Sequence, residues 1–411
     1  MQAKNIFFLS VIMLLVYSTG CANNNTNAIT NNATDTTGLS PVETKSPNSD
    51  YKPAFTGQTR IAGAKTTTPY KVEKIANNLG APFAIVAMPD GKLMVTIKSG
   101  YMEMLDANGK LVKKITGLPD VVYAGQGGLL DVAFDPNFSS NKMMYWSYSG
   151  KYKDGSATTV AKGKLNEAAG KVENISVIFH GTPTSSNLQY GSRLVFDKAG
   201  NLFVSIGEKF APDSRIKAQT LDTYLGKIIR ITTDGKPAAG NPFLKTAGAK
   251  PEIFSYGHRN PEGLDINPVT GELWESEFGP RGGDEINIIR AGKNYGWPVI
   301  TYGREYSGEK VGEGIQQKAG MEQPVYYWDP VISPSGICFY KGNAIPEWKD
   351  NLFVSSLSAQ HLDRLVIKNN KVVGEERLMT DINSRIRDVT YMNNMLYAIT
   401  DDGDIYRISK R

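Results

Sequence analysis

The residues best suited to chemistry lie in segments rich in glycine, proline and polar side chains. Arg385 and Arg387 alternate in SRIRDVTY, so in an extended strand both guanidinium groups point to the same side. Guanidinium pairs can bind carboxylates bidentately, although the same pattern also occurs on a solvated basic edge. A second segment, Gly-Pro-Arg-Gly-Gly from Gly279, is typical of a tight turn.

Other chemistries are disfavoured by what the chain lacks. Its three histidines, His180, His258 and His361, are scattered, and there is no G-x-S-x-G turn for a serine hydrolase. No His/Cys cluster indicates catalytic zinc. The 46 basic and 41 acidic residues are well mixed without a Lys/Arg block, so no nucleic-acid partner is expected. Cys338, in GICFY, is expected to be a small core residue.

The elements that would position these residues are short strands separated by turns, from about Tyr70 onward. One unit recurs, in which a polar turn precedes an apolar strand and a second turn follows. Its six copies are PDGKLMVTI from Pro89, SSNKMMYWSYS from Ser139, KAGNLFVSIG from Lys198, VTGELWESEF from Val269, KDNLFVSSL from Lys349 and NNMLYAITDDGDIYRI from Asn393.

Such copies cannot bury their faces alone, so they must stack or close into a ring. Radial closure leaves only short, protected edges, whereas a β-sandwich, the competing fold, does not explain six similar units. The expected fold is therefore all-β, a six-bladed β-propeller over residues 66–411. The segment YKVEKIA, from Tyr70, is expected to pair with the C-terminal blade and close the ring.

The N-terminus has the features of an export signal. Lys4 provides a positive charge, and Ile6 to Tyr17 form an apolar stretch too short to span a membrane. Small residues then lead into Cys21, and this resembles the bacterial lipoprotein signal, in which the cysteine is lipidated. Residues 1–21 are thus expected to be a lipoprotein-type signal, with a plain secretory signal as the alternative.

Residues 22–65 are dominated by Asn, Thr, Ser, Ala and Pro. A stretch of this composition buries too little apolar area to offset its ordering entropy, so it is expected to be a disordered tether. Two acyl chains on Cys21 would give stable anchoring. The protein is therefore expected on the bacterial envelope, periplasmic or at the outer-membrane surface.

Six loop segments carry a family resemblance. They are AGQGGLLDVAFDPNF from Ala124, YGSRLVFDKAGNLFVSIGE from Tyr190, PEIFSYGHRNPEGL from Pro251, GELWESEFGPRGGDEINIIRAGKNYGWP from Gly271, PVYYWDPVISPSG from Pro324 and SRIRDVTY from Ser384. In this order they resemble the soluble PQQ-dependent sugar dehydrogenases, most closely the aldose sugar dehydrogenase branch. The resemblance implies a six-bladed propeller that oxidises aldoses at C1 by hydride transfer to PQQ, held with calcium, and passes electrons to an acceptor.

The resemblance also implies roles for individual residues. Calcium would be bound through the backbone carbonyls of Gly279 and Pro280, and it would polarise the quinone carbonyl. His258 is expected to be a buried structural histidine. The residues implied to contact the cofactor are Gln126, Arg259, Asn260, Arg385 and Arg387.

One position departs from the family. Gln189 stands where the family has its general-base histidine, and an amide cannot accept a proton at useful pH. Loss of a positioned base typically costs roughly 10²–10⁴-fold in rate. Three outcomes stay open: Glu208, whose counterpart partners the base in the family, substitutes for it; the protein is a catalytically weak or inactive PQQ- or sugar-binding propeller; or it is a surface binding module.

Overall fold

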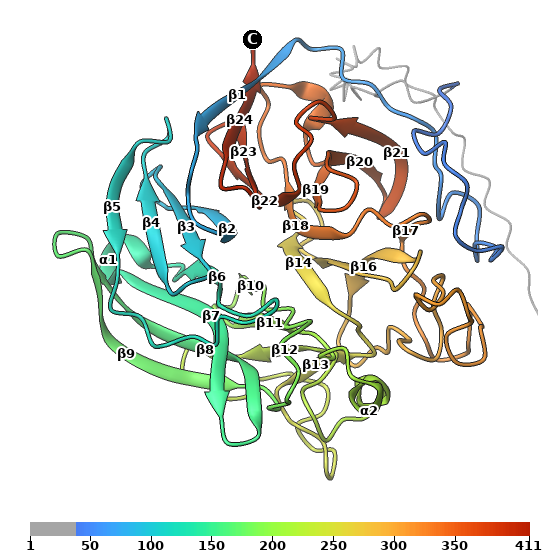
Figure 1. The fold of residues 1–411 in the computed structure, drawn as a ribbon, viewed down its shortest axis with the longest axis horizontal. Helices are drawn as coiled ribbons and strands as arrows, with labels where there is room; N and C mark the ends of the chain where they lie inside the picture. Colours follow the sequence, from blue (N-terminus) through green and yellow to red (C-terminus); the bar gives the residue numbers. More distant parts are fainter. Residues whose placement is uncertain (1–37) are drawn as a thin grey trace, which may run out of the picture. The chain divides into compact units, whose positions relative to one another are not determined.

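The computed structural model describes residues 38–411, and most of their regular structure is β-strand (Figure 1). Residues 1–37, which include Cys21, lie outside the described residues, so the signal and its lipid attachment stay predictions. Among the residues described, no helix is long and apolar enough to cross a membrane.

The strands form six four-stranded antiparallel sheets, or blades. Blades 1 to 3 consist of β2 (Pro82–Ala87), β3 (Leu93–Ile97), β4 (Tyr101–Leu105), β5 (Leu111–Ile115); β6 (Leu129–Phe134), β7 (Met143–Tyr152), β8 (Gly155–Asn166), β9 (Lys171–His180); and β10 (Leu194–Phe196), β11 (Leu202–Ile206), β12 (Lys227–Ile231), β13 (Ile253–Tyr256). Blades 4 to 6 consist of β14 (Pro261–Ile266), β15 (Leu273–Glu277), β16 (Asp284–Ile289), β17 (Tyr326–Trp328); β18 (Pro334–Phe339), β19 (Leu352–Ser356), β20 (Leu362–Lys368), β21 (Lys371–Leu378); and β22 (Ile386–Met392), β23 (Met395–Thr400), β24 (Ile405–Lys410), β1 (Tyr70–Ala76). The short helices are α1 (Phe138–Asn141), α2 (Pro212–Arg215) and the 3₁₀ turns η1 (Ile216–Gln219) and η2 (Pro346–Trp348).

The blades stand in a ring around a central axis, and the first strand of each blade lies nearest that axis (Figure 1). The predicted six-bladed β-propeller is confirmed. Each of the six repeated segments contains all or most of the second strand of a blade, namely β3, β7, β11, β15, β19 and β23. These second strands are buried on both faces because each blade packs against its two neighbours.

The ring closes through the first strand of the chain. β1 pairs antiparallel with β24, and Tyr70 lies opposite Lys410. The predicted pairing of YKVEKIA with the C-terminal blade is therefore confirmed. It joins the two ends of the propeller in one sheet and covers an edge of β24 that would otherwise have unpaired backbone groups.

Hydroxyl groups bridge five of the six seams between blades. Each comes from a second strand and donates a hydrogen bond to a backbone carbonyl at the first strand of the next blade. The donors are Thr96, Ser147, Ser205, Ser276 and Ser355. In the sixth blade, Ile399 occupies the matching register position of β23. The blades are thus joined by buried hydrogen bonds as well as by apolar packing.

The described part of the predicted tether is ordered. Residues 38–65 run along the outer strands β17 and β21, where the Ala64 amide donates to the Glu375 carbonyl and Glu43 pairs with Arg377 at 2.8 Å. The carboxylate of Asp329 accepts backbone N–H bonds from Asn48 and Ser49 at 2.7 and 3.1 Å. Composition alone missed these backbone and ionic contacts, which offset the ordering entropy, so disorder is the wrong description of residues 38–65.

Candidate functional site

A cavity of about 390 Å³ opens on the axis, where the loops that precede the first strands converge. We call it the loop-face cavity. The residues of its wall are Phe83, Lys98, Gly125, Gln126, Gln189, Arg259, Asn260, Glu262, Phe278, Tyr306, Ser333, Leu357, Arg385 and Arg387. All five predicted cofactor residues, and also Gln189, therefore face one space although they come from four separate segments of the chain.

The two arginines of SRIRDVTY share one carboxylate. The Nε atoms of Arg385 and Arg387 each lie 2.7 Å from an oxygen of Asp401, so both guanidinium groups do face the same side. Arg387 Nη1 also lies 3.2 Å from Glu262 Oε2. Burial alone would raise the pKa of Asp401, but the charge of Arg387 and the hydrogen bonds from both arginines hold it below its ordinary value. Asp401 thus fixes the pair in position.

The third arginine is held by backbone carbonyls. Arg259 Nη1 donates to the carbonyls of Phe278 and Gly279 at 3.2 and 2.9 Å, while its buried Nε has no hydrogen-bond partner. Its guanidinium group also lies 5.2 Å from the centre of the Trp297 ring. Arg259 is therefore oriented without a carboxylate partner, and its charge is available to an anionic ligand.

Two amide side chains tie the neighbouring loops together. Asn260 Oδ1 accepts from the Gly191 amide at 3.0 Å, and its Nδ2 donates to Glu262 at 3.0 Å. Gln126 Oε1 accepts from the backbone amide of Gln189 at 2.6 Å. These bonds fix the segment that carries Gln189 against the loops on both sides.

Gln189 lies on the wall in a left-handed backbone conformation, with φ 47°, and its buried Oε1 has no partner. Glu208 is not part of the wall. The preceding residue, Gly207, packs directly against the Gln189 carbonyl and Asn260, which places Glu208 in the layer behind these two residues. Burial raises the pKa of Glu208, opposed by the charge of Arg259. The residue proposed as a substitute base is therefore close to the site but does not face the cavity.

The predicted calcium loop borders the cavity through Phe278. The Gly279 amide donates to Asp284 Oδ1 at 2.8 Å, and Asp284 Oδ2 accepts from the amides of Ile332 and Ser333. Burial raises the pKa of Asp284 to about 7, against these backbone bonds. The carbonyl oxygens of Phe278 and Gly279 both accept from Arg259 Nη1 at this edge, and oxygen is the ligand type that calcium prefers. The loop is thus compatible with calcium, and Asp284 supports it.

Sequence reasoning missed several residues near the site. Lys98 lines the wall, and burial followed by the charge of Arg387 lowers its pKa. Tyr306 lies at the mouth and is 61% exposed. Behind the wall, the Lys209 amine has no hydrogen-bond partner and lies 3.0 Å from the centre of the Tyr190 ring, and burial lowers its pKa to about 6. Lys98 and Lys209 lie just after the ends of β3 and β11, where no sequence motif or periodic pattern identifies them as site residues.

A second axial cavity, of about 470 Å³, is lined mainly by the first strands themselves. Arg193 lies on its wall between Asp131 and Asp388, at 3.6 and 3.0 Å. The guanidinium group of Arg193 also packs 4.8 Å from the ring of Phe83, which belongs to the loop-face cavity. We call this second space the acidic cavity, because four aspartates line it against Arg193 and Lys341.

Comparison with known proteins identifies the family to which this chain belongs. Residues 79–407 match the model of the family described as glucose/sorbosone dehydrogenase. The aldose sugar dehydrogenase YliI of Escherichia coli is 40% identical over 347 residues, which cover 83% of this chain and 93% of that protein. The crystal structure of the soluble aldose sugar dehydrogenase from Escherichia coli in the apo form matches with a TM-score of 0.79 and 39% identity, over 83% of this chain and 100% of that one.

A third similar protein carries the cofactor. The PQQ-bound form of the aldose sugar dehydrogenase from Streptomyces coelicolor matches with a TM-score of 0.68 and 25% identity, over 84% of this chain and 99% of that one. The match to the family model spans all six blades. The fold, the order of the loop motifs and these similarities agree, and the chain belongs to the glucose/sorbosone dehydrogenase family.

Proposed function

We propose that the protein oxidises aldose sugars at C1, with PQQ bound in the loop-face cavity. The supporting observation is the charge of the wall, where Lys98, Arg259, Arg385 and Arg387 face a single carboxylate, Glu262. PQQ carries three carboxylates on a flat ring system, so a polar site of this size with several guanidinium groups suits it. The PQQ-bound similar structure supports the same assignment.

The chain's own residues would bind and orient the ligands. Arg385 and Arg387, already fixed by Asp401, would pair with cofactor carboxylates, and Gln126 and Asn260 would supply amide hydrogen bonds. The carbonyls of Gly279 and Pro280 would hold calcium. When bound, PQQ supplies the group that takes the C1 hydride, and calcium supplies a Lewis acid beside it.

The proton of the sugar hydroxyl needs an acceptor, and the wall offers a poor one. Gln189 can hydrogen-bond the hydroxyl through its free Oε1 but cannot take its proton. Glu262 is occupied by Asn260, Ser335 and Arg387. Glu208, in the layer behind Gln189, has a free buried Oε1 and a raised pKa, so we propose it as the base, with one water molecule passing the proton to it because its carboxylate does not face the cavity.

Gln189 also favours a second candidate function. With a neutral amide at the position nearest the substrate, the protein would bind PQQ or sugar with little turnover. The two functions share the cofactor site and differ only in proton transfer.

Turnover with an aldose and an artificial electron acceptor, in the presence of PQQ and calcium, tests the proposal. The enzyme assignment predicts activity in the wild type, with loss in Glu208→Gln while PQQ still binds. Activity that is absent in the wild type and gained in Gln189→His identifies the weak-binding alternative. No PQQ binding by an intact fold would contradict both.

We also propose that the protein is lipid-anchored to the bacterial envelope through Cys21, on the strength of the sequence alone. Radiolabelled fatty acid should be incorporated into the wild type in cells and not into Cys21→Ser. Label in both proteins, or in neither, would contradict the anchor. The partners would be a sugar, an electron acceptor and the membrane.

A further inference from the structure

Residues 38–65, which we call the strap, lie outside the part of the chain that matches the family model, because that match begins at residue 79. The strap runs beside β17 and β21, the outer strands of blades 4 and 5 (Figure 1). Three of its residues or pairs contact neighbours of the Gly279–Gly283 turn, which connects β15 to β16. This turn follows Phe278 of the cavity wall, so the strap reaches the surroundings of the site from outside the ring.

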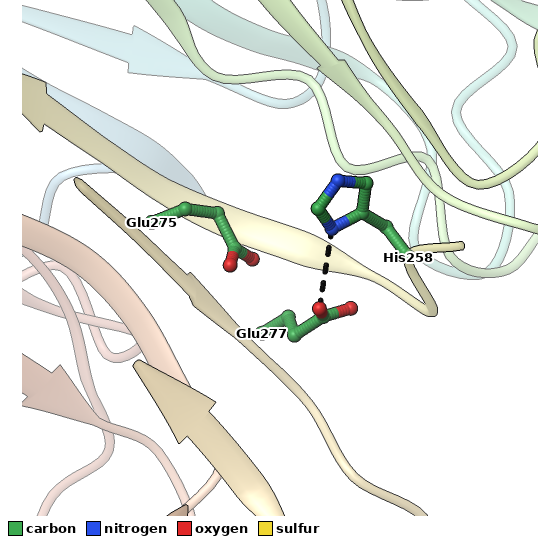
Figure 2. A group of neighbouring side chains, drawn as sticks. All are labelled: His258, Glu275 and Glu277. Atoms are coloured by element: carbon green, nitrogen blue, oxygen red, sulfur yellow. Dashed lines mark hydrogen bonds and ion pairs between the residues drawn. The ribbon is translucent and has the colours of Figure 1, made fainter. Parts of the chain in front are cut away.

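The Gly279–Gly283 turn depends on neighbours beyond its own blade. Its start is fixed in blade 4, where the Glu277 carboxylate at the end of β15 lies 3.2 Å from His258 Nδ1 (Figure 2). Further along, Gly282 and Gly283 have φ of 86° and 72°. Glycine has more conformational freedom than any other residue, so a turn of this composition keeps one conformation only where other segments hold it.

Asp329 is the first link between the strap and the turn. Its carboxylate is 5% exposed and accepts the amides of Asn48 and Ser49 at 2.7 and 3.1 Å and the Ser49 hydroxyl at 2.9 Å. The same carboxylate packs on Gly282, where an added Cβ would lie only 2.8 Å from Asp329 Oδ1. The strap therefore fixes the side chain against which the middle of the turn lies.

Arg304 is the second link. Its backbone exchanges two hydrogen bonds of 2.9 Å with the backbone of Arg281, inside the turn. Its guanidinium group lies 2.6 Å from Asp50 and 5.0 Å from the centre of the Tyr51 ring, and both residues belong to the strap. Because Asp50 is exposed, its ion pair contributes little, so the strap acts here mainly by packing Tyr51 on the arginine.

Gln58 is the third link, and it is fully buried. Its Oε1 accepts from the Ala54 amide at 2.7 Å and from the Tyr302 hydroxyl at 3.1 Å, while its Nε2 donates to the Pro324 carbonyl at 3.0 Å. The backbone of Tyr302 packs on the end of the turn, where a Cβ added to Gly283 would lie 2.7 Å from the Tyr302 carbonyl carbon. Gln58 thus fixes the residue that borders the end of the turn.

We propose that the strap is a positioning element of the loop-face cavity, which holds the Gly279–Gly283 turn in its ligand-binding conformation. That the ligand of this turn is calcium rests on the proposed function. No strap residue is part of the cavity wall, so the strap acts through the turn and not on the ligand directly. Calcium–oxygen distances are about 2.4 Å, and backbone carbonyls move only with the chain, so a turn that loses its support binds the ion more weakly.

The first test measures the turn itself, in the full-length protein without PQQ or calcium. The amides of Arg281 and Gly283 donate to backbone carbonyls outside the turn and should exchange slowly with solvent. In Ser49→Ala and Gln58→Met, hydrogen exchange measured by mass spectrometry should be roughly 10-fold faster in peptides that contain these two amides. Ser49→Ala is the milder change, and it keeps the test open if Gln58→Met folds poorly.

The matched control is Glu43→Gln. Glu43 also belongs to the strap, but its side chain pairs with Arg377 of β21 and not with a neighbour of the turn. The turn should therefore exchange at the wild-type rate in this variant. Equal exchange of the turn in all four proteins would overturn the proposal, and so would a turn that Glu43→Gln loosens as much as Gln58→Met does.

The second test separates positioning from stability. With saturating PQQ, calcium is titrated and PQQ absorbance is followed. The half-saturating calcium concentration should rise roughly 10-fold in Gln58→Met, and high calcium should restore the wild-type amount of bound PQQ. A lower melting temperature with an unchanged half-saturating concentration would overturn the proposal. If the wild type binds neither PQQ nor calcium, the proposed sugar oxidation fails, whereas the exchange of the turn still decides the role of the strap.

Discussion

The loop-face cavity and the acidic cavity lie on the same axis and have similar volumes, yet they differ in charge and in hydrogen bonding. The first has four cationic residues against Glu262, whereas the second has four aspartates against Arg193 and Lys341. The carboxylates of Asp131 and Asp388 accept backbone N–H bonds from the next blade, from Leu194 and Ile85. The residues of the acidic cavity therefore stabilise the fold by joining neighbouring blades.

Charge pairing separates the two spaces more clearly than hydrogen bonding does, because Arg193 Nη2 in the acidic cavity also has no hydrogen-bond partner. In the loop-face cavity, Gln189 Oε1 and Arg259 Nε have no partner within the described residues. In the acidic cavity, the charge of Arg193 is used between two aspartates, and burial, opposed by Arg193, raises the pKa of Asp131 to about 6. The charge of Arg259 therefore stays available to a ligand, whereas the charge of Arg193 is paired with two aspartates and serves stability.

Gln189→His gives the largest expected change, because it should make the loop-face cavity fully catalytic. Histidine tolerates the positive φ at this position better than most residues do. Aldose turnover with saturating PQQ should rise by roughly 10²–10⁴-fold, the usual contribution of a positioned base, where no base acts in the wild type, and by much less where Glu208 already accepts the proton. Unchanged turnover in a variant that still binds PQQ would mean that proton transfer does not limit the reaction.

Arg193→Met should lower the stability of the fold. Any effect on the chemistry of the loop-face cavity should follow from this loss of stability. The substitution leaves Asp131 and Asp388 buried without their cation, and breaking a buried ion pair costs about 3–5 kcal/mol of the free energy of unfolding. Urea denaturation at pH 7, followed by tryptophan fluorescence, measures this. The exposed control Lys74→Met should unfold like the wild type. Equal effects of the two variants would remove the distinction between the cavities.

Arg387→Gln should have the opposite profile. It removes a guanidinium group that is held for ligand binding, so the dissociation constant for PQQ should rise roughly 10- to 100-fold. A titration of PQQ absorbance in the presence of calcium gives the value, with Arg407→Gln, away from the cavity, as the control. If both arginine variants bind PQQ like the wild type, the cations of the loop face have no special role.

Ser276→Ala should have the smallest effect. It removes the hydroxyl that donates to the Ser335 carbonyl at 2.8 Å across the seam between blades 4 and 5. The free energy of unfolding should fall by about 1 kcal/mol, and the affinity for PQQ should stay unchanged. Ile399 shows that one seam exists without such a bond. A large loss of PQQ affinity would show that the seams and the cavity are coupled.

Much of the fold and part of the site could be predicted from the sequence. The six repeats became the second strands, and YKVEKIA closed the ring, because turn chemistry and strand alternation are local signals. Gln126, Arg259 and Arg387 reached one wall because their motifs precede or begin first strands that all start at the same end of the axis. Their common location was predicted from the resemblance to the family and not from their spacing in the sequence.

The rest depends on contacts between distant segments. Residues 38–65 resemble a linker in composition, and their order depends on partners such as Asp329 and Arg377, more than 250 positions away. The sequence predicts a structural His258 but not its partner Glu277, which lies one strand further on, at the end of β15. Lys209 is buried over Tyr190 with nothing in its neighbours to mark it. Such long-range pairings leave no trace in a short stretch of sequence.

The most direct test of the central claim is a crystal structure of the protein with PQQ and calcium. We predict PQQ in the loop-face cavity beside Gln189, with its carboxylates on Arg385 and Arg387 and with calcium at the Gly279–Pro280 turn. PQQ in the acidic cavity, or a loop-face cavity that stays empty in crystals with saturating PQQ, would contradict it.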